Sequence, residues 1–179
     1  MSRVQLAVEQ ISFAREHTIW LLDQTPATEW FRLPPGGVSH IAWQVGHLAF
    51  AEYSLVLCDI RGPQLQYTEL ISEKHVTLFG PDSVPDPDPA KYPSQSELRA
   101  VFDQVHEQVL RALAGLGEGE LDQPVPDPLP FARTRLLMLL WCARHEMQHA
   151  GQIGLLRRQL GYAHLWEHQM TCWPHFTAA

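Results

Sequence analysis

Two histidines that stand four residues apart, His145 and His149, have the spacing of a metal-ligand pair. They lie in the segment 135–161, whose apolar residues and final Gly161 predict one long helix. Because residues i and i+4 share one face of a helix, the two imidazoles project side by side. Imidazole nitrogen binds zinc, nickel and iron, so the pair can hold one divalent metal ion from a single rigid element.

A third ligand must come from another helix, and His47 is the best candidate. It is flanked by Val45 and Phe50 in a segment that is apolar on nearly every face. An imidazole buried there without a partner would cost about 1–3 kcal/mol, which a metal ion or a hydrogen-bonding neighbour would remove. We therefore predict a metal site formed by His47, His145 and His149. The alternative at each position is a core histidine with a protein partner.

Two other polar residues lie close to these ligands in the sequence. Gln152 follows His149 on the same helix face, where it could hydrogen-bond a bound molecule or a neighbouring helix. Glu52 follows His47, and we expect it to face solvent, the alternative being a carboxylate that orients His47. No general acid or base follows from the pattern. Glu146 and Gln152 are the nearest candidates for a catalytic role, although Glu146 lies about 100° round the helix from the preceding histidine.

The pentapeptide HEMQH also matches the zinc-protease motif, in which Glu146 would be the general base. The extended form of that motif needs glycine at position 152 and histidine at position 155, whereas this chain has Gln152 and Leu155. The other form needs a glutamate from a later helix, and Glu167 is the only glutamate after Glu146. Since no substrate-binding sheet is predicted either, the protease is the least favoured interpretation.

Three histidines without a fourth protein ligand would leave coordination positions open. Open positions are typical of a catalytic site, whereas a structural zinc site is usually closed by four protein ligands. Cys142 and Cys58 each stand alone in apolar segments, so we expect them to pack in the core. The alternative to an enzyme is a metal-stabilised module without turnover, in which the same histidines couple metal binding to folding.

The C-terminal tail, residues 162–179, repeats the histidine spacing. His164 and His168 stand in HLWEH, and His175 follows. No long helix is predicted to hold them. We interpret them as surface or interface residues, with a secondary metal site as the alternative.

Four segments predict the helices that would position the site. Apolar residues recur at helical spacing in the first and third, and the third starts with a capping box at Ser94 and Glu97. Ser39 can cap the second, and the fourth begins after Pro128 and Pro130. The predicted helices cover about 3–23, 39–59, 94–115 and 135–161.

About 35 residues connect the second and third helices. The first half, QYTELISEKHVTLF, is compatible with a short helix, and the second, GPDSVPDPDPAKYP, contains five prolines and must be a loop. This connection either lines the site or merely covers the bundle. No segment alternates with a period of two, so we expect no strands. The pattern predicts an all-α four-helix bundle with a long Pro-rich second connection, in a single domain 1–179 with its core at about 3–161.

The composition of the chain limits the classes of binding partner that are expected. The net charge of −7 argues against nucleic acid and against anionic membrane surfaces. No apolar run is long enough to span a membrane, and the N-terminus lacks the pattern of a signal peptide. Three cysteines without paired spacing favour a reducing cytoplasm. The second and fourth helices are apolar nearly all round, which predicts a homodimer.

Three segments together resemble the DinB-like superfamily, which includes the YfiT-type proteins. They are WQVGHLAFAE (43–52), LFGPDSVPDPDPAKYPSQSEL (78–98) and HEMQHAGQIGLLRR (145–158). The resemblance spans about residues 5–161 and implies a four-helix bundle with a divalent metal held by three histidines. Position by position, these are His47, His145 and His149.

The resemblance also implies a class of reaction. Family members with assigned activities mostly transfer a low-molecular-weight thiol, such as bacillithiol or mycothiol, to an electrophile. Related sulfoxide synthases carry a glutamate two residues after the last histidine, where this chain has Gly151, so their oxidative iron chemistry is not expected. The resulting hypothesis is a metal-dependent thiol S-transferase whose partners are a small thiol and an electrophile.

Overall fold

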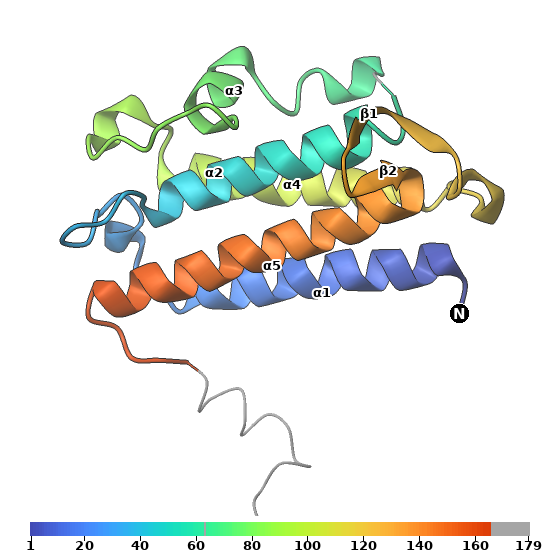
Figure 1. The fold of residues 1–179 in the computed structure, drawn as a ribbon. Helices are drawn as coiled ribbons and strands as arrows, with labels where there is room; N and C mark the ends of the chain where they lie inside the picture. Colours follow the sequence, from blue (N-terminus) through green and yellow to red (C-terminus); the bar gives the residue numbers. More distant parts are fainter. Residues whose placement is uncertain (63, 166–179) are drawn as a thin grey trace, which may run out of the picture.

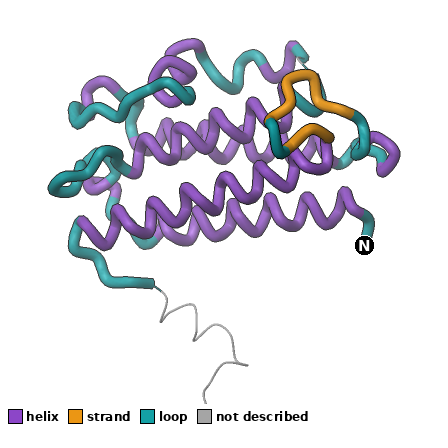
Figure 2. The backbone as a smooth tube through the Cα atoms, in the orientation of Figure 1, coloured by secondary structure: helices purple, strands orange, loops and turns teal. Residues whose placement is uncertain are grey.

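Five α-helices and one short hairpin make up the chain in the computed structural model, which describes residues 1–62 and 64–165. The helices are α1 (Arg3–Asp23), α2 (Ile41–Glu52), α3 (Glu73–Phe79), α4 (Gln95–Leu113) and α5 (Arg135–Gln159). A π-helical turn, Tyr53–Cys58, continues α2, and strands β1 (Pro124–Leu129) and β2 (Ala132–Thr134) form the hairpin. The all-α prediction is confirmed, with four long helices and the short α3 inside the connection (Figure 2).

Side-chain caps explain where the long helices begin. Ser2 and Gln5 form a capping box at the start of α1, and Ser94 and Glu97 form the predicted one at the start of α4. Thr134 caps α5 by accepting a hydrogen bond from the backbone N–H of Leu137. These caps satisfy N–H groups that have no partner within the helix.

The four long helices form two parallel pairs. Helices α1 and α5 lie side by side and run in the same direction, and α2 and α4 run the opposite way (Figure 1). Because α2 and α4 are parallel, the chain must return along the full length of the bundle between them, and the 59–94 connection does this. Helix α3 lies in this connection and packs on α2. The apolar outer face of α2 is therefore covered within one chain and does not require a second copy; homodimerisation stays a prediction.

Two predictions about local structure were wrong. The side chain that caps α2 is His40, which accepts a hydrogen bond from the backbone N–H of Trp43, and not Ser39. The sequence analysis expected no strands, but β1 and β2 pair in an antiparallel hairpin. The second strand is only three residues long and the first carries three prolines, so no alternating pattern could develop. The hairpin ends at Thr134, and α5 begins at Arg135, where the sequence analysis began the long helix.

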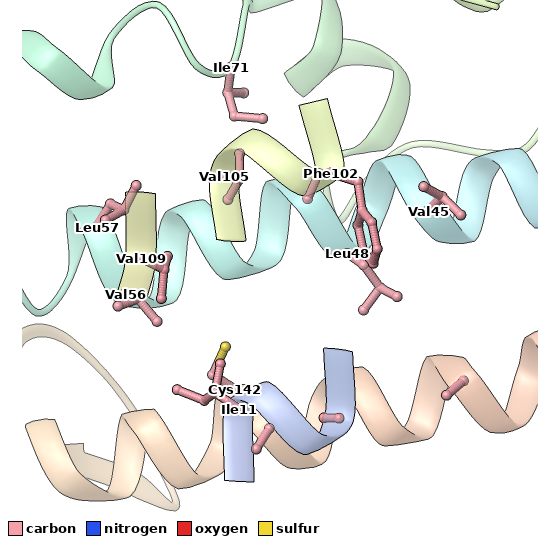
Figure 3. Close-up of a cluster of buried hydrophobic side chains, with 14 of the residues drawn as sticks. Ile11, Val45, Leu48, Val56, Leu57, Ile71, Phe102, Val105, Val109 and Cys142 are labelled. Carbon is pink, nitrogen blue, oxygen red and sulfur yellow. The ribbon is translucent and has the colours of Figure 1, made fainter. Parts of the chain in front are cut away.

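One continuous apolar core lies between the helix pairs. Ile11 of α1 and Cys142 of α5 face Leu48 and Phe102 of α2 and α4 across it (Figure 3). Cys142 is buried as expected, and burial raises the pKa of its thiol well above the usual value, so it stays protonated. In the part of the chain that the structure describes, no helix is long and apolar enough to cross a membrane.

A single buried guanidinium connects all four long helices. Arg15 of α1 is 1% exposed, and its Nε and Nη2 donate to the carboxylate of Glu146 on α5 at 2.9 and 3.2 Å. Nη2 also donates to Glu52 on α2 at 2.6 Å, and Nη1 donates to the carbonyl of Phe102 on α4 at 2.7 Å. The guanidinium carbon lies 3.3 Å from the centre of the Phe102 ring. His106 on α4 completes the cluster, because its Nδ1 donates to Glu52 at 2.8 Å.

The charges in this cluster depend on one another. Burial opposes the charge of Arg15, but Glu146 and Glu52 outweigh it and raise the pKa of the guanidinium. Burial raises the pKa of Glu146, and repulsion from Glu52 adds to this effect while Arg15 opposes it. Removing one member therefore leaves the others buried without compensation, which is the costly case for an internal ion pair.

We predict that Arg15→Met destabilises the protein by about 3–5 kcal/mol, because two carboxylates would stay buried without their cation. Urea unfolding at neutral pH measures this loss. Adding Glu52→Gln and Glu146→Gln to the same variant should restore part of the stability. As a control, Arg111→Ala removes an exposed pair with Glu107 and should cost less than about 1 kcal/mol. A comparable loss in the two single variants would contradict this account.

Candidate metal centre

Three histidines from two helices converge at the α2–α5 contact. One ring nitrogen from each of His47, His145 and His149 lies within 4.8 Å of the other two. The Nε2 atoms of His145 and His149 are 3.2 Å apart, and the ring centroid of His47 is 4.8 Å from that of His149. Two nitrogens that share a tetrahedral zinc ion at 2.0–2.1 Å are separated by roughly 3.4 Å. The spacing of the histidine pair therefore fits a shared divalent ion.

A glutamine fixes the orientation of His149. Its Nδ1 donates to Oε1 of Gln44 on α2 at 2.5 Å, and the amide nitrogen of Gln44 donates in turn to Oγ of Ser39 at 2.9 Å. Because a neutral imidazole carries only one N–H, this bond leaves Nε2 of His149 with a lone pair directed at the other histidines. Gln44 therefore selects the tautomer that a metal ligand needs.

A carbonyl from α3 fixes His47 in the same way. Nδ1 of His47 donates to the carbonyl oxygen of Phe79 at 2.8 Å, which again leaves Nε2 with the lone pair. Phe79 is held against α2 by close packing, since a Cβ on Gly46 would lie 2.4 Å from its ring. His75 adds a second link, because its Nε2 donates to the carbonyl of Gly46 at 2.9 Å. The long connection thus orients one ligand in addition to covering the bundle.

The three imidazoles are neutral at physiological pH. Burial and the neighbouring His47 lower the pKa of His145 to about 4. Burial, followed by repulsion from His145 and His47, lowers the pKa of His149 to about 3. Burial also lowers the pKa of His47, although the Phe79 carbonyl opposes the shift. A cluster that disfavours protons keeps its lone pairs available, which is the state that binds a metal cation.

Aromatic side chains surround the cluster. The Trp43 ring stacks on His47 with a centroid distance of 4.8 Å and an angle of 7°, and its Nε1 donates to Oγ of Ser83 in the connection. Trp141 lies next to His145 with a centroid distance of 5.8 Å. His149 is buried, whereas His145 is only partly buried, so the cluster is accessible from the side of His145.

The other candidate residues lie elsewhere. Glu146 is committed to Arg15 in the core, and the side chain of Gln152 is exposed. The expectation that Glu52 faces solvent was wrong: its side chain is 2% exposed because it pairs with Arg15 and His106. Of the tail residues, His164 is exposed, and 166–179, including Glu167, His168 and His175, lies outside the described residues.

The sequence analysis missed Gln44, although a signal was present. It is a polar residue in a largely apolar helix, three residues before His47, and so on the same helix face. The Phe79 carbonyl that accepts the hydrogen bond of His47 had no such signal, because every residue type carries a backbone carbonyl.

Comparisons with known proteins agree with this fold. A family model of the DinB superfamily matches residues 10–153. Among solved structures, a conserved protein from Enterococcus faecalis aligns with a TM-score of 0.69 at 20% identity, over 90% of this chain and 99% of that one. At this identity the likeness concerns the fold alone. No curated protein matches the chain.

We predict that Gln44→Leu weakens zinc binding by about 10–100-fold, because His149 loses the acceptor that fixes its tautomer. A competition titration against a chromophoric chelator measures the affinity. Gln152→Leu is the matched control, since that glutamine is exposed on α5, and it should leave the affinity unchanged. Equal affinities for the wild type and Gln44→Leu would show that the hydrogen bond does not orient the ligand.

Gly46 offers a second test of how the connection supports the site. Gly46→Ala should destabilise the protein by about 1–3 kcal/mol, because its Cβ collides with the Phe79 ring. Gly151→Ala is the control: its Cβ meets nothing within 4 Å, so the substitution should stabilise α5 by about 0.5–1 kcal/mol. Thermal unfolding distinguishes the two, and a loss of stability in both would refute the packing argument.

Proposed function

Because the chain belongs to the DinB superfamily and brings three neutral histidines together, we propose that it is a metal-dependent thiol S-transferase. The observation that carries the proposal is the convergence of His47, His145 and His149 on one point, with His145 partly exposed. Three protein ligands leave coordination positions open for substrate, as in catalytic metal sites. Zinc, nickel and iron all suit imidazole ligands.

The bound cation would supply the activation of the thiol, by lowering its pKa so that the thiolate forms at neutral pH. The residues of the chain supply the geometry. Gln44 and the Phe79 carbonyl hold two imidazoles in the tautomer that leaves Nε2 unprotonated. This preorganisation means that neither His47 nor His149 has to rotate or lose a proton when the site is loaded.

The reaction transfers sulfur to carbon. The thiolate sulfur attacks the electrophilic carbon, an S–C bond forms, and the leaving group departs with the electron pair of the broken bond. The thiol proton passes to solvent, so no buried general base is required. Trp43 and Trp141 flank His47 and His145, and their apolar rings would exclude water from a bound electrophile.

The environment of Glu146 argues against the protease interpretation. A protease of the HExxH type needs this carboxylate as its general base, but here it accepts two hydrogen bonds from Arg15 in the core. A non-catalytic metal-binding module would use the same three histidines, so activity must decide between it and the transferase.

The proposal predicts metal-dependent conjugation of a low-molecular-weight thiol to monochlorobimane, with displacement of chloride. The assay uses protein purified with its metal, and bacillithiol and mycothiol as thiols. A free thiol of pKa about 8.5 is roughly 3% ionised at pH 7, so loss of the metal should slow conjugation by roughly 30-fold or more. The double variant His145→Ala, His149→Ala should show this loss.

The matched control is Met147→Ala with Gln148→Ala, which alters exposed residues on the same turn of α5 and should keep full activity. Full activity in the double histidine variant would refute the proposal. A protein that loses thermal stability when treated with a chelator, yet conjugates neither thiol, would instead be the non-catalytic module.

A further inference from the structure

A cavity lies between α1 and α5, near the C-terminal ends of both helices, which Figure 1 shows at the same end of the bundle. Its volume is about 240 Å³. Trp20 and Leu21 of α1 and Leu165 beyond α5 line it with apolar surface. Two guanidinium groups and two imidazoles also line it, from Arg157, Arg158, His17 and His164. A cavity with apolar walls and a few charged groups has the composition of a small-molecule site.

This cavity is separate from the metal centre. Gly154, which lines it, is five residues after His149, and at 100° per residue the two positions lie roughly 140° apart around α5. The histidine ligands face α2, whereas the cavity faces α1. A molecule bound here would not contact the three histidines.

Two glycines of α5 leave room for the cavity. Gly151 and Gly154 both line it, and a Cβ built on either would meet nothing within 4 Å. Gly in the middle of a helix lowers its stability, and neither of these is required by close packing or by backbone geometry. Their effect is to keep this face of α5 open beside the arginines.

Arg157 has an unusual electrostatic environment. It is 3% exposed, close to the 1% of Arg15, but the two differ in their partners. Arg15 is paired with two carboxylates, whereas no carboxylate lies within ion-pair distance of Arg157 in the described ranges 1–62 and 64–165. Burial lowers the pKa of Arg157, and Tyr162, whose ring centre lies 5.5 Å from the guanidinium carbon, opposes the shift. A buried cation without a counter-charge is normally avoided in proteins.

The hydrogen bonds of Arg157 leave part of its fork available. Its Nη1 donates to the carbonyl of Gln24 at 2.7 Å and to Oγ1 of Thr25 at 2.8 Å, which anchors the side chain to the end of α1. Both bonds use the same nitrogen. The N–H groups of Nε and Nη2 form the edge of the guanidinium that binds a carboxylate through two parallel hydrogen bonds.

We infer that this cavity binds a small organic carboxylate whose apolar body packs on Trp20 and Leu21 and whose carboxylate pairs with Arg157 and Arg158. The ligand would supply the counter-charge that the described residues do not provide. The volume is below the 300–1,000 Å³ typical of pockets for drug-sized ligands, so the ligand is about the size of one aromatic ring with its carboxylate. This inference does not depend on the proposed function.

Benzoate is the probe, titrated into the full-length protein with its metal retained and followed by calorimetry. Benzamide has the same shape without the charge and should bind at least about tenfold more weakly. Arg157→Lys keeps the charge but loses the fork, and should weaken benzoate binding by about tenfold. Gly154→Leu fills the cavity beside Arg157 and Arg158 but keeps both arginines, and it should abolish binding. The test therefore does not depend on a variant that removes the buried Arg157.

Two control variants on α5 should bind benzoate as the wild type does. Arg144→Gln removes an exposed arginine that lies away from the cavity, and Gln159→Leu adds a leucine at an exposed position that does not line it. The inference would be overturned if the wild type bound no benzoate at about 10 mM, since a dissociation constant above this concentration is too weak for a specific site. Unchanged binding by Gly154→Leu, or equal binding of benzamide, would overturn it as well.

Discussion

The charge of Arg15 must be compensated inside the core by groups from the other helices. This requirement constrains the arrangement of the four long helices. One side chain from α1 reaches a carboxylate on α2, a carboxylate on α5 and a carbonyl on α4. Apolar contacts alone tolerate sliding and rotation of helices, because hydrophobic attraction has no direction. A buried ion cluster tolerates neither, since each displaced partner is left without compensation in a medium of low dielectric constant.

The same cluster lies beside the metal ligands along both helices that carry them. Glu146 is adjacent to His145, and Glu52 lies five residues after His47, at the end of α2. Arg15 therefore fixes the rotation of α5 and α2 relative to each other, which is the variable that decides whether three imidazoles meet. Ligand sites depend on such support, because an error of about 1 Å in the scaffold is enough to weaken them.

The long connection orients a metal ligand, although its proline-rich composition predicts only a loop. A bundle in which α2 and α4 are parallel needs a chain segment that returns along its whole length, and here that segment carries α3 across α2. The carbonyl of Phe79 then orients His47, and Ser83 holds the tryptophan that stacks on it. The topology of the bundle and the preorganisation of the metal site are thus linked through one segment.

The sequence by itself determined the helix class, the metal-ligand candidates and the parts of the fold that depend on local spacing. The periodicity and capping residues that specify a helix lie within a few turns of one another in the sequence. The interval between His145 and His149 likewise specifies that they share one helix face. Only the tertiary structure decided the other features, which are the burial of Glu52 with Arg15, the role of Gln44, the hairpin before α5, and the cavity beside Arg157. These features depend on residues that are distant in sequence, such as Arg15 and Glu146, and a local pattern contains no information about which distant partner a polar side chain will meet.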